Sequence, residues 1–429
     1  MDFFLKNIKI IDQNSLYNEQ RVDIWVQSGI VRAVGIGLSV PAEVEIFDYP
    51  KACVSVGFID VGAQANDPGK EHREDLESLC EAAQAGGFTT VAVQPNTLPT
   101  VHSKTEVAYI LNKTASMPVE MLPIGAVSEN AAGKDLTELY DMHHAGAVAF
   151  SDGNKPIQDG GLLLRALQYV TMFDGLVMNH PHDQSVANGG QMHEGVMSTT
   201  LGLRGIPSLA EELMLQRDLR LLEYSGARLH VSNVSTADAV AQIRAAKAHG
   251  LRVSCSVAVA NLVLDDEALA GFDSNLKLMP PLRSTADRRA LYMGLQDGTI
   301  DFISSNHTPL EDERKNLEFP YAGFGMIGLE TAFALSRTHL KDVLSLGQLV
   351  EKWTVNARKI LGLPVPSIAV GQRANLTVFY ADEAWVFEEK HIRSKSKNTP
   401  FVGEQLIGRV VRTFLSKKQQ HNSRPQMVS

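Results

Sequence analysis

The chain has 429 residues, 44% of them hydrophobic and 21% charged, which is the composition of a globular protein with a substantial core. Its net charge of -9 argues against nucleic acid as the main partner, because phosphate binding needs clustered lysine and arginine. Cys53, Cys80 and Cys255 are too widely spaced for a zinc knuckle, and neither a signal peptide nor a membrane-spanning run is evident. These features predict a soluble protein of the cytoplasm.

Short runs rich in valine and isoleucine alternate with segments of helical period from about residue 56 onward. In the segment 72–87, for example, Leu76, Leu79 and Ala83 fall on one helical face and Gly86-Gly87 end the pattern. The predicted strands are 56–63, 88–95, 120–128, 146–153, 175–181, 228–235, 252–260 and 300–309. Eight strands with intervening helices over roughly 310 residues predict a closed (β/α)₈ TIM-like barrel with insertions.

Both ends of the chain have shorter, alternating patterns. The strand candidates there are 3–11, 22–35, 43–55, 375–388 and 405–415. We therefore expect a small β-sandwich assembled from both termini, with the barrel inserted between its two parts. The predicted boundaries are 1–55 for the first part of the sandwich, 56–366 for the barrel, 367–416 for the second part and 417–429 for a polar, mobile tail.

Motifs spread through almost the whole chain carry a family resemblance. They are GFID at 57, DPGKEHRED at 67, AAQAGGFTTVAVQPNTLP at 82, MHEGVMSTTLGLRGIPSLAEE at 192, LKLMPPLRSTADRRAL at 276, FGMIGLET at 324 and KNTPFVGEQLIGRV at 397. The chain resembles the dihydroorotase branch of the amidohydrolase superfamily, and the PPLR, FGMIGLET and KNTPF elements favour dihydroorotase over hydantoinase. The resemblance implies a metal-bearing barrel that opens and closes the dihydroorotate ring in pyrimidine biosynthesis with a zinc-activated hydroxide.

Four of the six positions that match the family's metal ligands have lost that chemistry. The His-x-His pair of the first barrel strand falls on Gly62 and Gln64, and the ligand histidine expected before VST is Asn233. The strand-eight aspartate, which in the family is both ligand and proton shuttle, falls on Asn306. Because an amide does not transfer protons near neutral pH, Asn306 cannot act as the general base.

The other two ligand positions keep their chemistry, Asp152 at the end of strand four and His180 at the end of strand five. The second aspartate usual after Asp152 is Gly153, and His182 is an unexpected neighbour of His180. A structural zinc site with four good ligands is worth about 10–16 kcal/mol, or roughly 3 kcal/mol per ligand. Two ligands are therefore too few for tight binding, and we expect no cofactor, or at most weak residual zinc.

The substrate side of the expected site is altered as well. The family's arginine for the substrate carboxylate falls on Asn66, the asparagine expected before PPLR is Met279, and a later substrate-facing histidine is Leu310. The TPHH-type segment of strand seven has become AVAN, which ends at Ala260 and Asn261. These substitutions predict an apolar, uncharged remnant of the substrate pocket.

Several retained residues have a structural explanation beside the functional one. Asn96 keeps a substrate-binding residue type and Phe324-Gly325 keep the loop that would cover the ring, yet all three can serve loop packing. Asp152 can equally be a hydrogen-bonding residue at a strand end, and His180 and His182 can be hydrogen-bonded histidines without a metal.

Two classes of function remain. The first is a non-catalytic dihydroorotase homologue, because the ligands are lost while strand patterns and loop motifs are intact. The resemblance includes inactive homologues that assemble with aspartate carbamoyltransferase, so we expect a homo-oligomer or a hetero-complex with that enzyme, and neither nucleic acid nor membrane as partner. The alternative is an active cyclic amidohydrolase that converts dihydroorotate to N-carbamoyl-aspartate at an atypical metal site. His180, His182, Asp183 and Asp152 would then surround one metal, although adjacent strand-end residues point to different sides.

Overall fold

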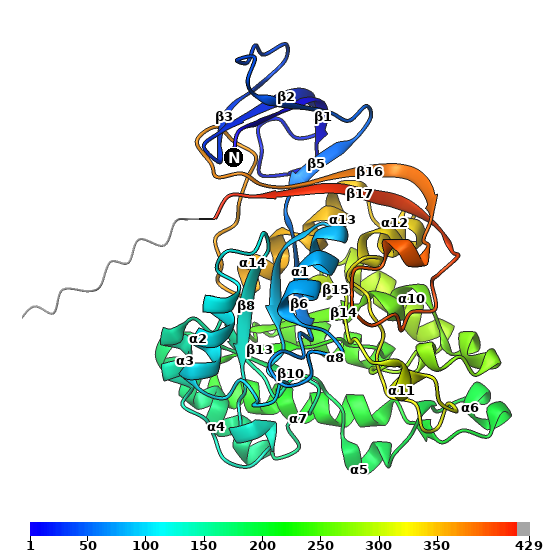
Figure 1. Cartoon of the computed structure of the whole chain (residues 1–429). Helices are drawn as coiled ribbons and strands as arrows, with labels where there is room; N and C mark the ends of the chain where they lie inside the picture. The colour runs from blue at the N-terminus through cyan, green and yellow to red at the C-terminus, as the bar shows by residue number, and fades with distance from the viewer. Residues whose placement is uncertain (418–429) are drawn as a thin grey trace, which may run out of the picture.

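The computed structural model describes residues 1–417, which form a large barrel beneath a smaller β domain (Figure 1). The predicted tail lies outside the described residues from position 418 onward. No helix of the described chain is both long enough and apolar enough to cross a membrane.

Eight parallel strands form the barrel, and each lies within one of the predicted runs. They are β6 (Phe58–Ala63), β7 (Phe88–Val93), β8 (Glu120–Gly125), β9 (Ala149–Phe150), β10 (Leu176–Asn179), β13 (Arg228–Val231), β14 (Val253–Ala258) and β15 (Phe302–Ser304). Neighbours in the sheet follow chain order, as a barrel of right-handed β/α units requires. The predicted barrel is therefore confirmed.

A buried carboxylate holds the first barrel strand against the last. Asp60 of β6 is fully buried and accepts hydrogen bonds from the N–H and the hydroxyl of Ser305, both at 2.7 Å. The backbone N–H of Gln64 adds a bond to the carbonyl of His307 at 3.0 Å. Because burial raises the pKa of Asp60, these donors are what keeps its charged form tolerable in the core.

Helices cover the outside of the barrel. The longer ones are α1 (Leu76–Ala85), α2 (Lys104–Lys113), α3 (Leu139–Ala145), α4 (Gly160–Val170), α7 (Leu209–Ser225), α8 (Ala237–Ala248), α10 (Thr285–Gln296), α12 (Ala332–Leu340) and α13 (Leu346–Trp353). Shorter ones are α5 (Gln184–Ala187), α6 (Val196–Leu201), α9 (Val259–Val263), α11 (Asp312–Lys315) and α14 (Val355–Ile360), and a two-stranded ribbon joins β11 (Met192–His193) to β12 (Gly205–Ile206). Helix α1 begins later than the predicted segment because Asp75 caps it, accepting from the N–H of Ser78 at 2.8 Å.

The prediction for the end of strand seven was wrong. Strand β14 stops at Ala258, and Ala260 and Asn261 lie in α9. Val259, Leu262 and Val263 are buried at helical spacing, and a continuous apolar run cannot be divided between strand and helix by periodicity alone. The Asn261 side chain donates to the carbonyl of Pro281 at 2.9 Å, so it supports the PPLR segment.

Strands from both ends of the chain form the β domain. They are β1 (Phe3–Ile10), β2 (Arg21–Gln27), β3 (Ile30–Gly35), β4 (Glu45–Asp48), β5 (Cys53–Val56), β16 (Asn375–Val386) and β17 (Gln405–Leu415). Hydrogen bonds link them into one sheet of order β17-β16-β5-β1-β2-β3, with β4 on β1, rather than into two separate sheets. Phe3 and Phe414 stack at 4.1 Å between ring centroids, so the two termini share one core. The boundaries at 55 and 366 stay a prediction.

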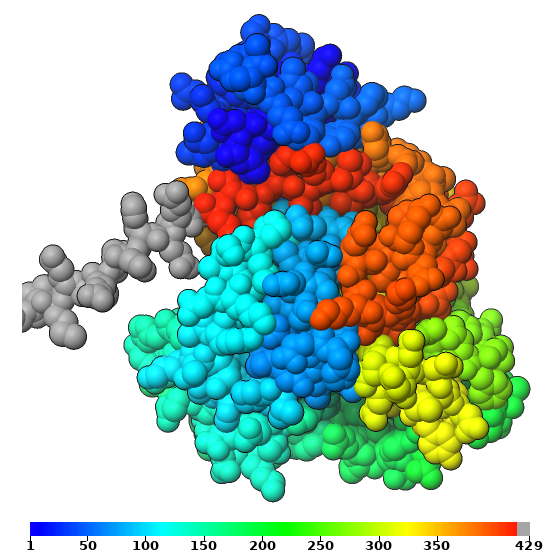
Figure 2. Space-filling view, in the orientation of Figure 1, coloured from blue at the N-terminus to red at the C-terminus, as the bar shows by residue number. Residues whose placement is uncertain are grey.

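The hairpin of β16 and β17 joins the β domain to the barrel. In Figure 2 the red C-terminal strands lie between the blue N-terminal part and the barrel below it. Phe379 of β16 contacts Phe333 of α12 with ring centroids 4.8 Å apart, and the Arg337 side chain donates to the carbonyl of Ala381 at 3.1 Å. The β domain is therefore packed onto the barrel wall.

Candidate functional site: the C-terminal ends of the barrel strands

The six positions that match family metal ligands all lie at the same rim of the barrel. Gly62 is near the end of β6, and Gln64 follows it. Asp152, His180, Asn233 and Asn306 follow β9, β10, β13 and β15 respectively. In parallel barrels this rim carries the reacting groups, so the fold brings the positions together where the family's chemistry would take place.

Two of these positions are joined to each other by a hydrogen bond. The Asn233 side-chain amide donates to the side-chain oxygen of Asn306 at 3.2 Å. The Ser304 hydroxyl donates to the side-chain oxygen of Asn233 at 2.7 Å, and the Asn306 amide donates to the carbonyl of Met279 at 3.0 Å. The two amides thus bond to one another and to their neighbours, and neither presents an anionic or imidazole ligand.

The backbone at the changed positions suits the residues that now occupy them. Gly62, Asn66, Gly153, Asn233 and Asn306 all have positive φ, with values of 103°, 58°, 64°, 56° and 50°. Glycine and asparagine adopt this left-handed region more readily than other residue types. In β6 the strand register also shifts between Val61 and Ala63, which places Gly62 in a bulge.

Gln94, which the sequence did not single out, lies between two of the substituted positions. A Cβ atom on Gly62 would stand 3.0 Å from the Gln94 amide nitrogen, and one on Gly153 would stand 3.0 Å from the Gln94 side-chain oxygen. That oxygen is buried and has no hydrogen-bond partner within residues 1–417. The Gln64 amide makes only a long contact of 3.5 Å to the Thr308 hydroxyl. Neutral amides therefore fill the space beside the first strand.

Asp152 is committed to a structural contact. Its two oxygens accept from the N–H of Ser128 at 2.8 Å and from the Ser128 hydroxyl at 2.5 Å. Burial raises the pKa of Asp152, and the Ser128 hydrogen bonds oppose that rise. With both oxygens engaged by one serine, Asp152 is placed as a hydrogen-bonding residue at a strand end. No local signal in the sequence marked Ser128, because its partner is far along the chain.

His180 keeps part of the arrangement of a metal ligand. Its Nδ1 lies 3.2 Å from the carbonyl of Ser232, to which it donates, and its Nε2 is buried without a partner in the described chain. The His182 ring stacks on it at 6.1 Å between centroids. Burial lowers the pKa of both rings, that of His182 to about 4, so both are neutral near pH 7. Asp183 instead caps α5, accepting from Ser185 and Val186, and does not join them.

Asn96 and the covering loop have structural contacts of their own. Asn96 donates to the carbonyl of Asp152 and accepts from the N–H of Asn154, both at 2.9 Å, so its side chain clamps the loop after β9. Gly325, at a φ of 150°, donates its N–H to the carbonyl of Lys277 at 2.9 Å. The Lys277 ammonium lies 4.8 Å from the centroid of the Phe324 ring, a cation–π contact that holds the loop.

The expected apolar pocket is uncharged at the substituted positions but is not apolar. Met279 packs with Val186 on a small hydrophobic cluster, and Leu310 is buried. The Asn66 side-chain nitrogen is buried without a partner in residues 1–417. Amide side chains stand at four of the substituted positions, Gln64, Asn66, Asn233 and Asn306, and Gln94 adds a fifth amide between them. Sequence comparison position by position missed this, because the amides become neighbours only in the folded barrel.

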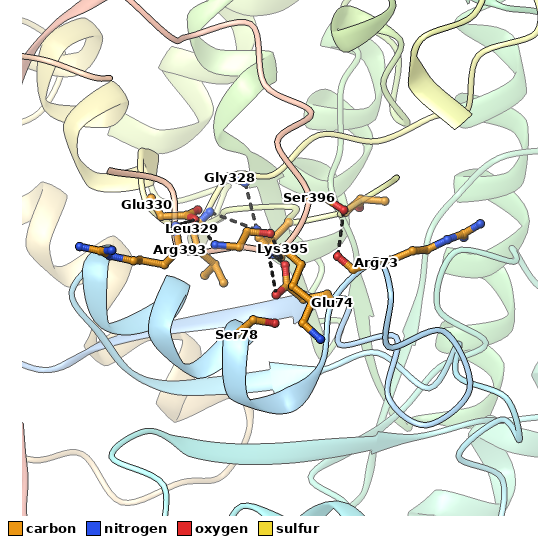
Figure 3. A network of polar contacts seen from close by, with 12 residues as sticks. Arg73, Glu74, Ser78, Gly328, Leu329, Glu330, Arg393, Lys395 and Ser396 are labelled. Atoms are coloured by element: carbon orange, nitrogen blue, oxygen red, sulfur yellow. Dashed lines mark hydrogen bonds and ion pairs between the residues drawn. The ribbon is translucent and has the colours of Figure 1, made fainter. Parts of the chain in front are cut away.

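Two of the family-like motifs, DPGKEHRED and FGMIGLET, meet the segment 393–396 in one polar network beside the rim (Figure 3). The buried Glu74 carboxylate accepts from the hydroxyl of Ser394, and its other oxygen accepts from the N–H of Lys395 at 3.3 Å. Glu330 accepts from the N–H groups of Arg393 and Ser394 at 3.1 and 3.0 Å. These contacts tie the segment 393–396 to the loops that follow β6 and β15.

The residues at the rim do not fit a zinc centre. Tight zinc sites use imidazole, thiolate and carboxylate ligands, whereas amides are poor partners for this ion. Across residues 1–417 no group of three or more His, Cys, Asp or Glu side chains is arranged to hold a metal. Of the two positions that keep ligand chemistry, Asp152 has both oxygens occupied and only His180 presents a free ring nitrogen.

Comparison with known proteins gives the family. Residues 52–239 match the family model described as Dihydro-orotase-like. The chain is 41% identical over 418 residues to "Dihydroorotase" of Syntrophus aciditrophicus, covering 97% of this chain and 98% of that protein. It is 38% identical to "Dihydroorotase" of Pelobacter propionicus, again over 97% of this chain and 98% of that protein.

Solved structures show the same fold. The L-hydantoinase (dihydropyrimidinase) of Arthrobacter aurescens has a TM-score of 0.84 and 26% identity, covering 96% of this chain and 94% of that one. The dihydropyrimidinase of Brevibacillus agri has a TM-score of 0.82 at 21% identity, with 97% and 94% covered. Relatives near 40% identity over almost the full length, together with this fold, place the chain in the dihydroorotase family.

Proposed function

We propose that this chain is a non-catalytic member of the dihydroorotase family that acts in pyrimidine biosynthesis as a structural or regulatory partner. The observation that carries the proposal is the hydrogen bond between the Asn233 and Asn306 side chains, at two positions where the family has metal ligands. An amide pair supplies neither a zinc ligand nor a general base, so both requirements of the family mechanism are unmet at one point.

The intact surroundings support a role for the surface. Eight barrel strands, the PPLR segment and the network around Glu74 are formed although the rim chemistry has changed. A chain under no functional constraint would also accumulate substitutions that disrupt its core and its loop contacts. We propose aspartate carbamoyltransferase as the partner, on the resemblance to inactive homologues that assemble with it. Co-purification of that enzyme with the full chain tests this part of the proposal.

The alternative function is hydrolysis of a cyclic amide at an atypical metal site. It is favoured by the name dihydroorotase on the relatives and by the unpartnered Nε2 of His180. Against it stand the two carboxylates that such a site would use, because Asp152 is engaged by Ser128 and Asp183 caps α5. One imidazole cannot hold a catalytic zinc, for which three protein ligands are usual.

The test is a dihydroorotase assay in both directions on the purified full chain with added zinc. The protein named dihydroorotase from Syntrophus aciditrophicus, prepared in the same way, is the positive control. We expect ring opening and ring closure to proceed at the rate of buffer alone. Turnover that a chelator abolishes and zinc restores would contradict the proposal and favour the alternative. A His180→Asn variant then shows whether His180 is needed for that turnover.

A further inference from the structure

A cavity of about 160 Å³ lies where the β16–β17 hairpin packs on α1 and α12 (Figure 1). Gln84 lines it from α1 and Phe333 from α12. Gly408 of β17 allows the close approach, because at its φ of 91° an added Cβ atom would stand 3.1 Å from the Cβ of Arg337. A cavity of this volume has room for one small ring, since an apolar cavity of about 150 Å³ binds benzene.

Aromatic rings form one wall of the cavity. Trp385 of β16 and Phe387 just after it have ring centroids 5.9 Å apart and ring planes at 89°, and Phe333 adds a third ring. The Nε1 of Trp385 already donates to the carbonyl of Gly408 at 3.0 Å, so the indole offers a ligand only its apolar surface. This wall favours an occupant with a flat ring.

Two opposite charges line the same cavity without pairing with each other. Glu330 is 7% exposed, and its Oε1 accepts from the N–H groups of Arg393 and Ser394, whereas its Oε2 has no hydrogen-bond partner within residues 1–417. The Arg393 guanidinium forms neither an ion pair nor a hydrogen bond in the same part of the chain. Figure 3 shows its side chain extending away from Glu74. A ligand with one donor and one anionic group would satisfy both side chains.

The other polar side chains of the cavity add donors. His391 accepts the N–H of Glu388 at its Nδ1, at 2.9 Å, which leaves Nε2 as the protonated nitrogen of the neutral ring. Arg409 is already paired with Glu383 at 3.2 Å. The donors therefore favour an anionic group on the ligand, and the free oxygen of Glu330 favours an N–H group.

We propose that the cavity between α1, α12 and the β16–β17 hairpin binds a small planar heterocycle that carries a carboxylate and a ring N–H. In this arrangement the carboxylate pairs with Arg393, the ring N–H donates to Oε2 of Glu330, and the ring packs against Trp385. The ligand would contact the segment 393–396, which hydrogen bonds to Glu330 and Glu74 tie to the loops at the rim. The inference goes beyond the proposed function and holds whether or not the rim is catalytic.

The experiment is a titration of the full chain with pyrrole-2-carboxylate, followed by ligand-observed NMR. We expect a dissociation constant of ~1 mM or lower, an affinity that a ligand of one ring can reach. Furan-2-carboxylate replaces the ring N–H by an oxygen, and pyrrole-2-carboxamide replaces the carboxylate by a neutral amide. Each should bind at least ~10-fold more weakly, because one of the two polar contacts is lost. No binding of pyrrole-2-carboxylate up to ~10 mM, or equally tight binding of either analogue, would overturn the proposal.

Arg393→Gln tests where the ligand binds, with Arg289→Gln as the matched control. The Arg393 guanidinium is unpaired within the described chain, so its removal should leave the thermal midpoint unchanged and raise the dissociation constant at least ~10-fold. Arg289 is exposed on α10 and does not line the cavity, so its replacement should leave the dissociation constant within ~2-fold. An unchanged dissociation constant in Arg393→Gln, or an equal rise in both variants, would place the binding elsewhere and overturn the assignment.

Discussion

At the scale of single residues, three of the four lost metal ligands coincide with left-handed backbone. Gly62, Asn233 and Asn306 each replace a family ligand and each have positive φ. Left-handed backbone costs an ordinary residue roughly 1–2 kcal/mol, while glycine and asparagine tolerate it. In this backbone a histidine at position 62, where φ is 103°, would therefore be strained. The glycine and asparagines at these positions suit the left-handed backbone, and the same substitutions remove the metal ligands.

Gly62→Ala tests whether the bulge in β6 requires glycine. We expect a loss of stability of about 1–2 kcal/mol, because alanine at a φ of 103° is strained whatever space surrounds it. The measurement is the thermal unfolding midpoint by calorimetry, with Gly271→Ala as control, since a Cβ at Gly271 would meet open space and needs no positive φ. Equal midpoints for the two variants would show that the bulge is not a constraint.

Asp152→Asn tests whether Asp152 is a structural residue. An amide can accept only one of the two Ser128 hydrogen bonds, so a loss of about 1–3 kcal/mol is expected. Asp183→Asn is the matched control, because α5 uses a single oxygen of Asp183 and asparagine caps a helix equally well. Calorimetry should show a lowered midpoint for Asp152→Asn alone. A drop in bound zinc without a drop in stability would instead make Asp152 a ligand.

At the scale of elements, buried lysines and one asparagine hold the loop after β15. The Lys315 ammonium of α11 donates to the carbonyls of Ser274 and Gly323 at 2.5 and 3.0 Å. Asn398 donates to the carbonyls of Thr308 and Gly325, both at 3.1 Å. The hydrogen bonds of Lys315 and Asn398 both act on segments that would cover a substrate in the family. Here these bonds fix the loop against the rest of the barrel.

Lys315 should make stability depend on pH. Burial lowers its pKa from 10.5 to about 7, so the unfolded chain binds more protons than the folded chain between pH 7 and 10. Stability should therefore rise from pH 7 to pH 9. Lys315→Met, which keeps the buried stem, should flatten this rise in the urea midpoint. A wild-type midpoint that falls over the same interval, or a variant with an unchanged slope, would contradict the assignment.

Asn398→Ala should loosen the loop without unfolding the barrel. Its side chain also accepts from the N–H of Leu310 at 3.1 Å, so three backbone groups lose their partner at once. Amide hydrogen exchange in the segment 308–327 should quicken by on the order of 10-fold or more. Asn112→Ala, at an exposed position of α2, should leave exchange there unchanged. An unchanged exchange rate in Asn398→Ala would show that the Asn398 hydrogen bonds do not hold the loop.

At the scale of the whole molecule, the sequence predicted the architecture well because strands and helices repeat with a local period. Each barrel strand lies inside a predicted run, and β17 matches the predicted 405–415. The end of β14 was mispredicted, since an apolar run reads the same in a buried strand and a buried helix. Gln94 and Ser128 were missed because their partners, Gly62 and Asp152, are distant in sequence. The replaced ligand positions could be named from motifs, but the pairing of Asn233 with Asn306 required the fold.

At the scale of the whole molecule, the family's fold is also present without the family's metal ligands. Its barrel and β domain are complete, while the rim carries amides at positions where the family binds metal. At the centre of the rim, the Asn233–Asn306 pair is held by hydrogen bonds to its neighbours and not by an ion. An intact fold around an altered rim is what we expect of a chain whose role lies in its surfaces.

The most direct test of this account is the zinc content of the purified full chain, measured by elemental analysis after dialysis against excess zinc and then against buffer. The account predicts fewer than ~0.1 zinc ions per chain, because the rim offers one free imidazole where tight sites use four ligands. Retention of about one or two zinc ions per chain would contradict it, and would mean that the rim rearranges to bind the metal that the family uses.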